Sequence, residues 1–140
     1  MKQTINSNVS GRNRMSKNLN ITQLQVEVNT WKRLLNFFSD ENVCLKNRLS
    51  EILKNGFDRK LLDEFENFQT KFVKQDEMIT FLRNDIAELD KLLLNDKLGI
   101  GKNEITIKGK LEHLRKNIAN SEGKFFQLQA NFNTYILENM

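Results

Sequence analysis

The stretch WKRLLNFFSDENVCLKNRLSEIL, residues 31–53, carries apolar side chains at alternating intervals of four and three residues. Residues with this spacing lie on one side of an α-helix, and a sustained repeat of this period predicts coiled-coil-like packing. Extended in both directions, the repeat covers residues 21–52 and contains one polar residue, Asn42. Its positions are Ile21, Leu24, Val28, Trp31, Leu35, Phe38, Asn42, Leu45, Leu49 and Ile52.

Two further segments carry the same repeat, and each again contains one polar exception. The second consists of Leu61, Phe65, Phe68, Phe72, Gln75, Ile79, Leu82, Ile86, Leu89 and Leu93. The third consists of Ile107, Leu111, Leu114, Ile118, Ser121, Phe125, Leu128, Phe132 and Tyr135. Three such repeats predict three long helices that bury one apolar side each against their neighbours.

The residues between the repeats are typical of helix ends. Gly56 can take the left-handed conformation that ends a helix, and Asp58 can cap the next one. Gly99 and Asn103 are suited to the same roles at the second break, although the third helix can begin anywhere from Asn103 to Lys108. We therefore expect helices over about 20–54, 58–97 and 104–138.

Short connections between long helices favour an all-α, elongated antiparallel bundle in up-down-up order over residues 20–140. In such a bundle the polar exceptions Asn42, Gln75 and Ser121 lie at similar heights. We expect them to form a polar core layer, in which they pair with one another or with water and fix the register of the helices. A small polar ligand pocket is the alternative. A compact bundle and a domain-swapped dimer are both compatible with the repeats.

Apolar residues also lie beside the repeat positions, as in Phe37, Cys44, Phe81 and Phe126. This wider apolar stripe is expected where each helix packs against two neighbours. We accordingly expect Cys44 to be partly buried as a small hydrophobic residue. As the single cysteine, it excludes an internal disulfide and a multi-thiolate metal site.

The formal net charge of +4 comes from the first 19 residues, which contain four basic residues and no acid. This segment is rich in Asn and Ser, and we expect residues 1–19 to form a disordered basic tail. Weak, non-specific nucleic-acid binding through this tail is one alternative function. The chain has no apolar run long enough to cross a membrane or to serve as a signal peptide, so we expect a cytoplasmic protein.

The inventory of reactive groups is small, and we predict no catalytic residue, no metal ligand and no cofactor. The stretch HLRKNIANSEG, residues 113–123, places Lys116 three residues after the single histidine, His113. It resembles histidine-containing phosphotransfer domains, which present a phosphorylatable histidine on a helical bundle. It departs from that family at Asn117, where a small glycine is expected. Phosphotransfer at His113 is therefore a second alternative function.

The stretches WKRLLNFFSDENVCLKNRLSEIL, FENFQTKF and LRNDIAELDKLL together resemble a group of small uncharacterised bacterial helical proteins. The resemblance covers most of residues 24–138 and implies no activity. The sequence thus predicts a non-enzymatic structural or interaction protein. Its expected partner is a second copy of the chain or the helix of another protein docked along an exposed groove.

Overall fold

The computed structural model describes residues 20–97 and 104–140. In these residues the chain forms three long helices, α1 (Ile21–Asn55), α2 (Leu62–Lys97) and α3 (Glu104–Asn139), with a short 3₁₀ turn η1 (Arg59–Leu61) before α2. The described residues contain no strand, so the predicted all-α class is confirmed. The expected tail over 1–19 and the expected helix ends at Gly99 and Asn103 lie outside the described residues.

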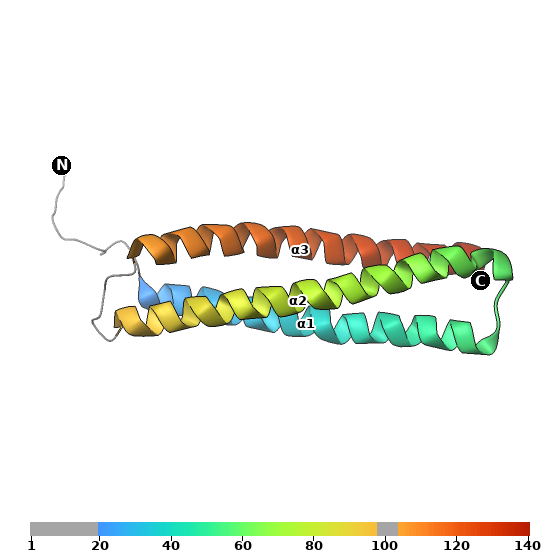
Figure 1. The fold of residues 1–140 in the computed structure, drawn as a ribbon, viewed down its shortest axis with the longest axis horizontal. Helices are drawn as coiled ribbons and strands as arrows, with labels where there is room; N and C mark the ends of the chain where they lie inside the picture. Colours follow the sequence, from blue (N-terminus) through green and yellow to red (C-terminus); the bar gives the residue numbers. More distant parts are fainter. Residues whose placement is uncertain (1–19, 98–103) are drawn as a thin grey trace.

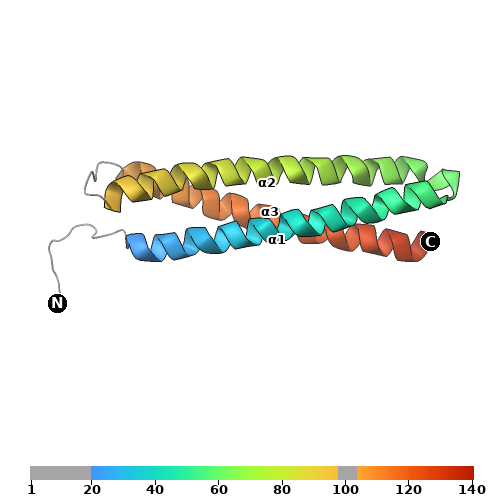
Figure 2. The ribbon, with the colours of Figure 1, turned by 90° about the horizontal axis from the view of Figure 1, so that it is seen from below.

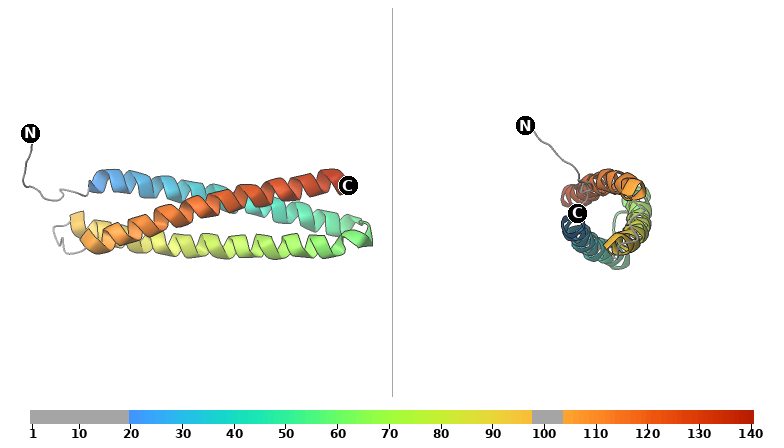
Figure 3. Two further views of the ribbon diagram at one scale, coloured as in Figure 1. Left: turned by 90° about the horizontal axis from the view of Figure 1, so that it is seen from above. Right: turned by 90° about the vertical axis from the view of Figure 1, so that its left-hand side faces the viewer.

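The three helices lie side by side and make an elongated molecule (Figure 1). In Figure 1, α1 runs from left to right, α2 returns along it, and α3 runs in the same direction as α1. Figure 2 shows the same order from below. The views from above and from one end show the helices winding around a common axis (Figure 3). Contacts between α1 and α3 agree with this, because the pairs Glu27–Arg115 and Glu41–Gln129 are both 88 residues apart.

Local chemistry explains where the helices begin and end. The Asn20 side chain accepts a hydrogen bond of 3.1 Å from the backbone N–H of Gln23, which caps the start of α1. At the other end of α1, Gly56 has a φ of 91°. Glycine adopts this conformation readily, whereas a residue with a side chain would be strained in it. Asp58 then accepts a bond of 3.0 Å from the N–H of Lys60. The predicted cap at Asp58 is confirmed, and it caps the 3₁₀ turn that leads into α2.

The buried side chains of the described residues coincide with the three repeats almost throughout. Ile136 is the one buried residue outside them, and the repeat positions that are only half-buried lie near the helix ends. Aromatic rings fill much of the space between helices. Phe38 of α1 stacks on Phe125 of α3 with ring centroids 4.6 Å apart, and Phe132 of α3 meets both Phe68 and Phe72 of α2 at 5.2 Å.

The wider apolar stripe is less buried than the sequence predicts. The side chains of Phe37, Phe81 and Phe126 are all exposed, and the expectation that Cys44 is partly buried is wrong, because Cys44 is exposed too. The physical reason lies in the packing. Both α1 and α3 pack closely on α2, whereas they approach each other less closely along their length. Phe37, Cys44 and Phe126 lie beside the repeats of α1 and α3 and are therefore left at the surface. Phe81 lies on α2, and this gap does not explain its exposure.

Candidate functional site

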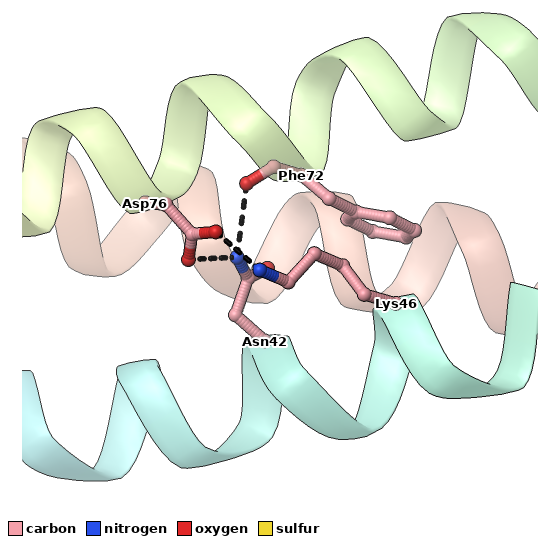
Figure 4. A network of polar contacts seen from close by, with 4 residues as sticks. All are labelled: Asn42, Lys46, Phe72 and Asp76. Carbon is pink, nitrogen blue, oxygen red and sulfur yellow. Dashed lines mark hydrogen bonds and ion pairs between the residues drawn. The ribbon is translucent and has the colours of Figure 1, made fainter. Parts of the chain in front are cut away.

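The polar position in the middle of α1 belongs to a network that joins α1 to α2 (Figure 4). Asn42 is fully buried, and its Nδ2 donates hydrogen bonds to the carbonyl oxygen of Phe72 at 2.9 Å and to Oδ1 of Asp76 at 2.7 Å. Lys46, one turn further along α1, donates to the other carboxylate oxygen of Asp76. The network thus combines a buried amide with an ion pair at the edge of the core.

The three expected polar core residues are buried, but Asn42 does not pair with Gln75 or Ser121. Gln75 and Ser121 are 8% and 5% exposed, and Asn42 pairs with Phe72 and Asp76 instead of with either of them. Within the described part of the chain, Asn42 Oδ1 and Gln75 Nε2 are buried and have no hydrogen-bond partner. The reason is geometric, since Asp76 follows Gln75 by one residue and lies on the side of α2 that faces α1.

Lys46 and Asp76 belong to this network, and the sequence alone did not single them out. Each directly follows a repeat position, Leu45 and Gln75 respectively. In coiled coils, the residues that flank the repeat form charged pairs between neighbouring helices. The same tendency points to Lys46 and Asp76 as candidates for such a pair. It does not say which charged residues meet, because that depends on how α1 and α2 align along their length.

His113 lies on the surface of α3, where the sequence places it beside the repeat. It lines a hollow of about 240 Å³ together with Asp85 of α2 and Lys110, one turn earlier on α3. Lys110 donates a hydrogen bond of 2.8 Å to Glu88, which lowers the pKa of that carboxyl below its usual value. Lys116 is exposed as well. His113 is therefore exposed, with a lysine and a carboxylate in the lining of the same hollow.

A groove with apolar residues in its lining runs between α1 and α3. It has a volume of about 580 Å³, and Trp31 and Leu34 of α1 and Ile118 of α3 lie along it. Arg115, which also lines the groove, donates two hydrogen bonds of 2.8 Å to Glu27. These bonds raise the pKa of the Arg115 guanidinium above its usual value.

Two exposed phenylalanines lie one turn beyond this groove. Phe37 of α1 is 46% exposed and Phe126 of α3 is 44% exposed. Each ring rests edge-on against the stacked pair in the core, Phe37 on Phe125 at 6.4 Å and Phe126 on Phe38 at 5.9 Å. We call the surface formed by these two rings and the groove the α1–α3 face. Its residues are Thr30, Trp31, Arg33, Leu34, Phe37, Arg115, Ile118, Ala119, Glu122 and Phe126.

No group of three or more His, Cys, Asp or Glu side chains in residues 20–97 and 104–140 could hold a metal ion. Over the same residues, no helix combines the length and the apolar character that crossing a bilayer requires.

No protein-family model, no curated protein and no solved structure matches this chain. The resemblance to small bacterial helical proteins stays a prediction. The surface of the molecule is therefore the basis for inferring its function.

Proposed function

We propose that this chain is a non-enzymatic interaction protein, an up-down-up bundle with coiled-coil-like packing that self-associates by covering its α1–α3 face with a second copy. The observation that carries the proposal is the pair of half-exposed rings, Phe37 and Phe126, supported from below by the stacked Phe38 and Phe125. Exposed aromatic side chains held by a rigid core are typical of the centres of protein interfaces.

The charges around the face support a second copy as the occupant. Arg33 of α1 and Glu122 of α3 both line the groove, so the face carries both signs of charge. Around a two-fold axis the same surface meets itself, and a face with both signs can then place opposite charges against each other. A face of one sign would repel its own copy.

Covering the apolar side chains of the α1–α3 face contributes to the free energy of dimer formation. Covering a half-exposed phenylalanine contributes on the order of 1 kcal/mol, and a two-fold dimer covers four such rings, two from each copy. The neighbouring groove adds the edges of Trp31, Leu34 and Ile118. This contribution supports reversible association at moderate protein concentration, because binding must also offset the loss of translational and rotational freedom.

Sedimentation velocity of the full chain over a range of concentrations tests the proposal. We expect a monomer–dimer equilibrium that the double variant Phe37→Ser/Phe126→Ser shifts to monomer. The matched control is Phe81→Ser/Val73→Ser, which removes two exposed apolar residues of α2 that are 53% and 48% exposed. A chain that is monomeric at every concentration, or a control that dissociates the dimer equally, would contradict self-association through this face.

Phosphotransfer at His113 is the second candidate, supported by the exposure of its imidazole beside Asp85 and Lys110. An acid-labile phosphate acquired from a phosphorylated response regulator, and lost in His113→Gln, would establish it. Asn117, half-buried one turn after His113, is a larger neighbour than that family's glycine. Lys116→Ala should then slow the transfer without unfolding the helix, because Lys116 is exposed.

We further propose a bacterial, cytoplasmic setting, which the single cysteine supports because reducing compartments disfavour disulfides. Nucleic-acid binding by residues 1–19 is the remaining alternative. Salt-sensitive binding of DNA that disappears when residues 1–18 are removed would establish it.

A further inference from the structure

A second groove, between α2 and α3, has a chemistry that self-association does not use. Lys71 and Lys74 of α2 and Lys124 of α3 line it, and its volume is about 340 Å³. We propose that this lysine-lined groove binds a small organic anion, a carboxylate with an apolar body. The groove lies on a different side of the bundle from the α1–α3 face, so this inference does not depend on the proposed function.

The charge of this groove is of one sign. No carboxylate is among its lining residues, whereas Asp85, Glu122 and Asp90 line the three other grooves described over the same part of the chain. The ion pairs found within residues 20–97 and 104–140 do not involve its three lysines. Three lysine side chains line one hollow that has no acid in its lining, and this favours the binding of an anion.

Two uncharged polar residues, Gln75 and Ser121, line the groove beside the lysines. Gln75, more than nine-tenths buried, lines the groove, and its Nε2 has no partner. A buried donor without a partner costs about 1–3 kcal/mol. Because Nε2 is shielded from solvent, a ligand oxygen reaches it and offsets this cost once the Gln75 side chain turns into the groove. The Ser121 hydroxyl lies in the same lining. A carboxylate accepts hydrogen bonds and donates none, so it complements these donors.

The remaining lining residues of the groove are apolar, so they favour a ligand with an apolar body. Met78 of α2 and Leu128 of α3 lie in the groove, and Phe81, one turn beyond Met78, is 53% exposed. A volume near 340 Å³ lies at the lower end of the range for small-molecule sites. A water molecule occupies about 30 Å³, so the groove holds a body of about ten non-hydrogen atoms. A medium-chain or aromatic carboxylate has this size and polarity.

Decanoate is a suitable probe for the full-length protein, followed by calorimetry and by the shifts of side-chain amide signals in ¹⁵N-labelled protein. We expect saturable binding of one decanoate per chain, with the Gln75 side-chain amide among the signals that shift most. Decanol keeps the apolar body without the charge, and inorganic phosphate keeps a charge without the body. Both should bind at least tenfold more weakly than decanoate.

Variants locate the site. Lys74→Gln/Lys124→Gln removes one lysine from each side of the groove and should weaken decanoate binding at least tenfold. The matched control Lys91→Gln/Lys116→Gln removes the same charge from exposed positions of α2 and α3 outside the groove, and should weaken binding less than twofold. Gln75→Leu should weaken decanoate binding about fivefold and leave decanol unaffected.

Three results would overturn the inference. The first is no saturable binding of decanoate, or equal binding of decanol. The second is an equal loss in the control variant, which would mean that net charge alone attracts the anion. The third is binding without a shift of the Gln75 amide.

Discussion

The side-chain nitrogen of Asn42 on α1 lies 2.9 Å from the carbonyl oxygen of Phe72 on α2. The same nitrogen also reaches Asp76, one turn further along α2, so a single buried amide is tied to two successive turns of its neighbour. A shift of α2 along α1 would leave that amide among apolar side chains without its partners, at the full cost of burying a polar group. We therefore expect Asn42 to fix the register of the first hairpin.

Register and stability are different properties, and variants of Asn42 should separate them. Asn42→Leu is expected to raise the free energy of unfolding by about 1 kcal/mol. The substitution removes the unpaired Oδ1 of Asn42. It leaves no other buried polar atom without a partner, because the Phe72 carbonyl keeps its hydrogen bond within α2 and the Asp76 carboxylate keeps its ion pair with Lys46. Urea denaturation measures the change. A clear loss of stability would show that the network is worth more than a buried leucine.

Asn42→Asp is the counterpart of that variant. It places a second carboxylate within hydrogen-bond distance of Asp76 at a fully buried position. Because two carboxylates so close cannot both be ionised without strong repulsion, we expect a loss of about 3 kcal/mol at pH 7 and a smaller loss at pH 4. Urea denaturation at both pH values measures this. A loss that does not depend on pH would mean that repulsion from Asp76 is not the cause.

Neighbouring residues on α2 should differ sharply in their contribution to stability. Phe72 is fully buried against Phe132, and Phe72→Ala should lower the free energy of unfolding by about 3–5 kcal/mol through the cavity that it leaves. Val73 is 48% exposed, and Val73→Ala should change it by less than 0.5 kcal/mol. Comparable losses in thermal or urea denaturation would mean that the repeat has been placed on the wrong residues.

Most of the fold could be predicted because core positions on a long helix follow from spacing alone. The alternation of four and three residues identified nearly every buried side chain, from Leu24 on α1 to Phe132 on α3. The exposure of Phe37 and Phe126 could not be predicted in the same way. It depends on how closely α1 and α3 approach each other, which is a property of the assembled bundle and not of either helix.

The candidate site shows the same limit at the level of single bonds. The sequence marked Asn42, Gln75 and Ser121 as polar residues in the core, and all are buried. It could not choose their partners, because a side-chain amide can reach a backbone carbonyl or a flanking carboxylate as easily as another core residue. Asp76 became the partner of Asn42 because the pairing of α1 with α2 places it there.

Replacing either of two glycines within α3 by alanine should stabilise the protein. A Cβ built at Gly109 or Gly123 meets no atom within 4 Å, so alanine fits at both positions. Each replacement should raise the free energy of unfolding by about 1 kcal/mol, because alanine favours the helix and restricts the unfolded chain. Gly56→Ala is the control and should be destabilising, since its φ of 91° is strained for any other residue. Urea denaturation of the three variants measures the difference, and a stable Gly56→Ala would contradict the turn geometry.

The ion pair between Glu88 and Lys110 should give the α2–α3 contact a pH dependence. The hydrogen bond from Lys110 lowers the pKa of Glu88 below its usual 4.5 in the folded protein. The stabilisation is therefore present above pH 4.5 and is lost as the pH falls through the lower pKa of the folded state. NMR titration of the Glu88 carboxyl should show this lowered pKa, and Lys110→Gln should return it towards 4.5. An unchanged pKa in the variant would mean that Lys110 is not the cause.

Cys44 offers a direct measure of whether the α1–α3 face becomes covered. Its thiol is exposed, and it lies seven residues, or two helical turns, after Phe37, so both project from the same side of α1. In dilute protein a thiol reagent should react with Cys44 within about threefold of its rate with the unfolded chain, because no folded segment shields the sulfur. At concentrations where sedimentation shows dimer, the reaction should slow, since the second copy lies over this side of the helix. Phe37→Ser/Phe126→Ser should keep the fast rate at every concentration. If the wild-type dimer reacts as fast as the monomer, the copies meet through another surface, and the two phenylalanines require a different explanation.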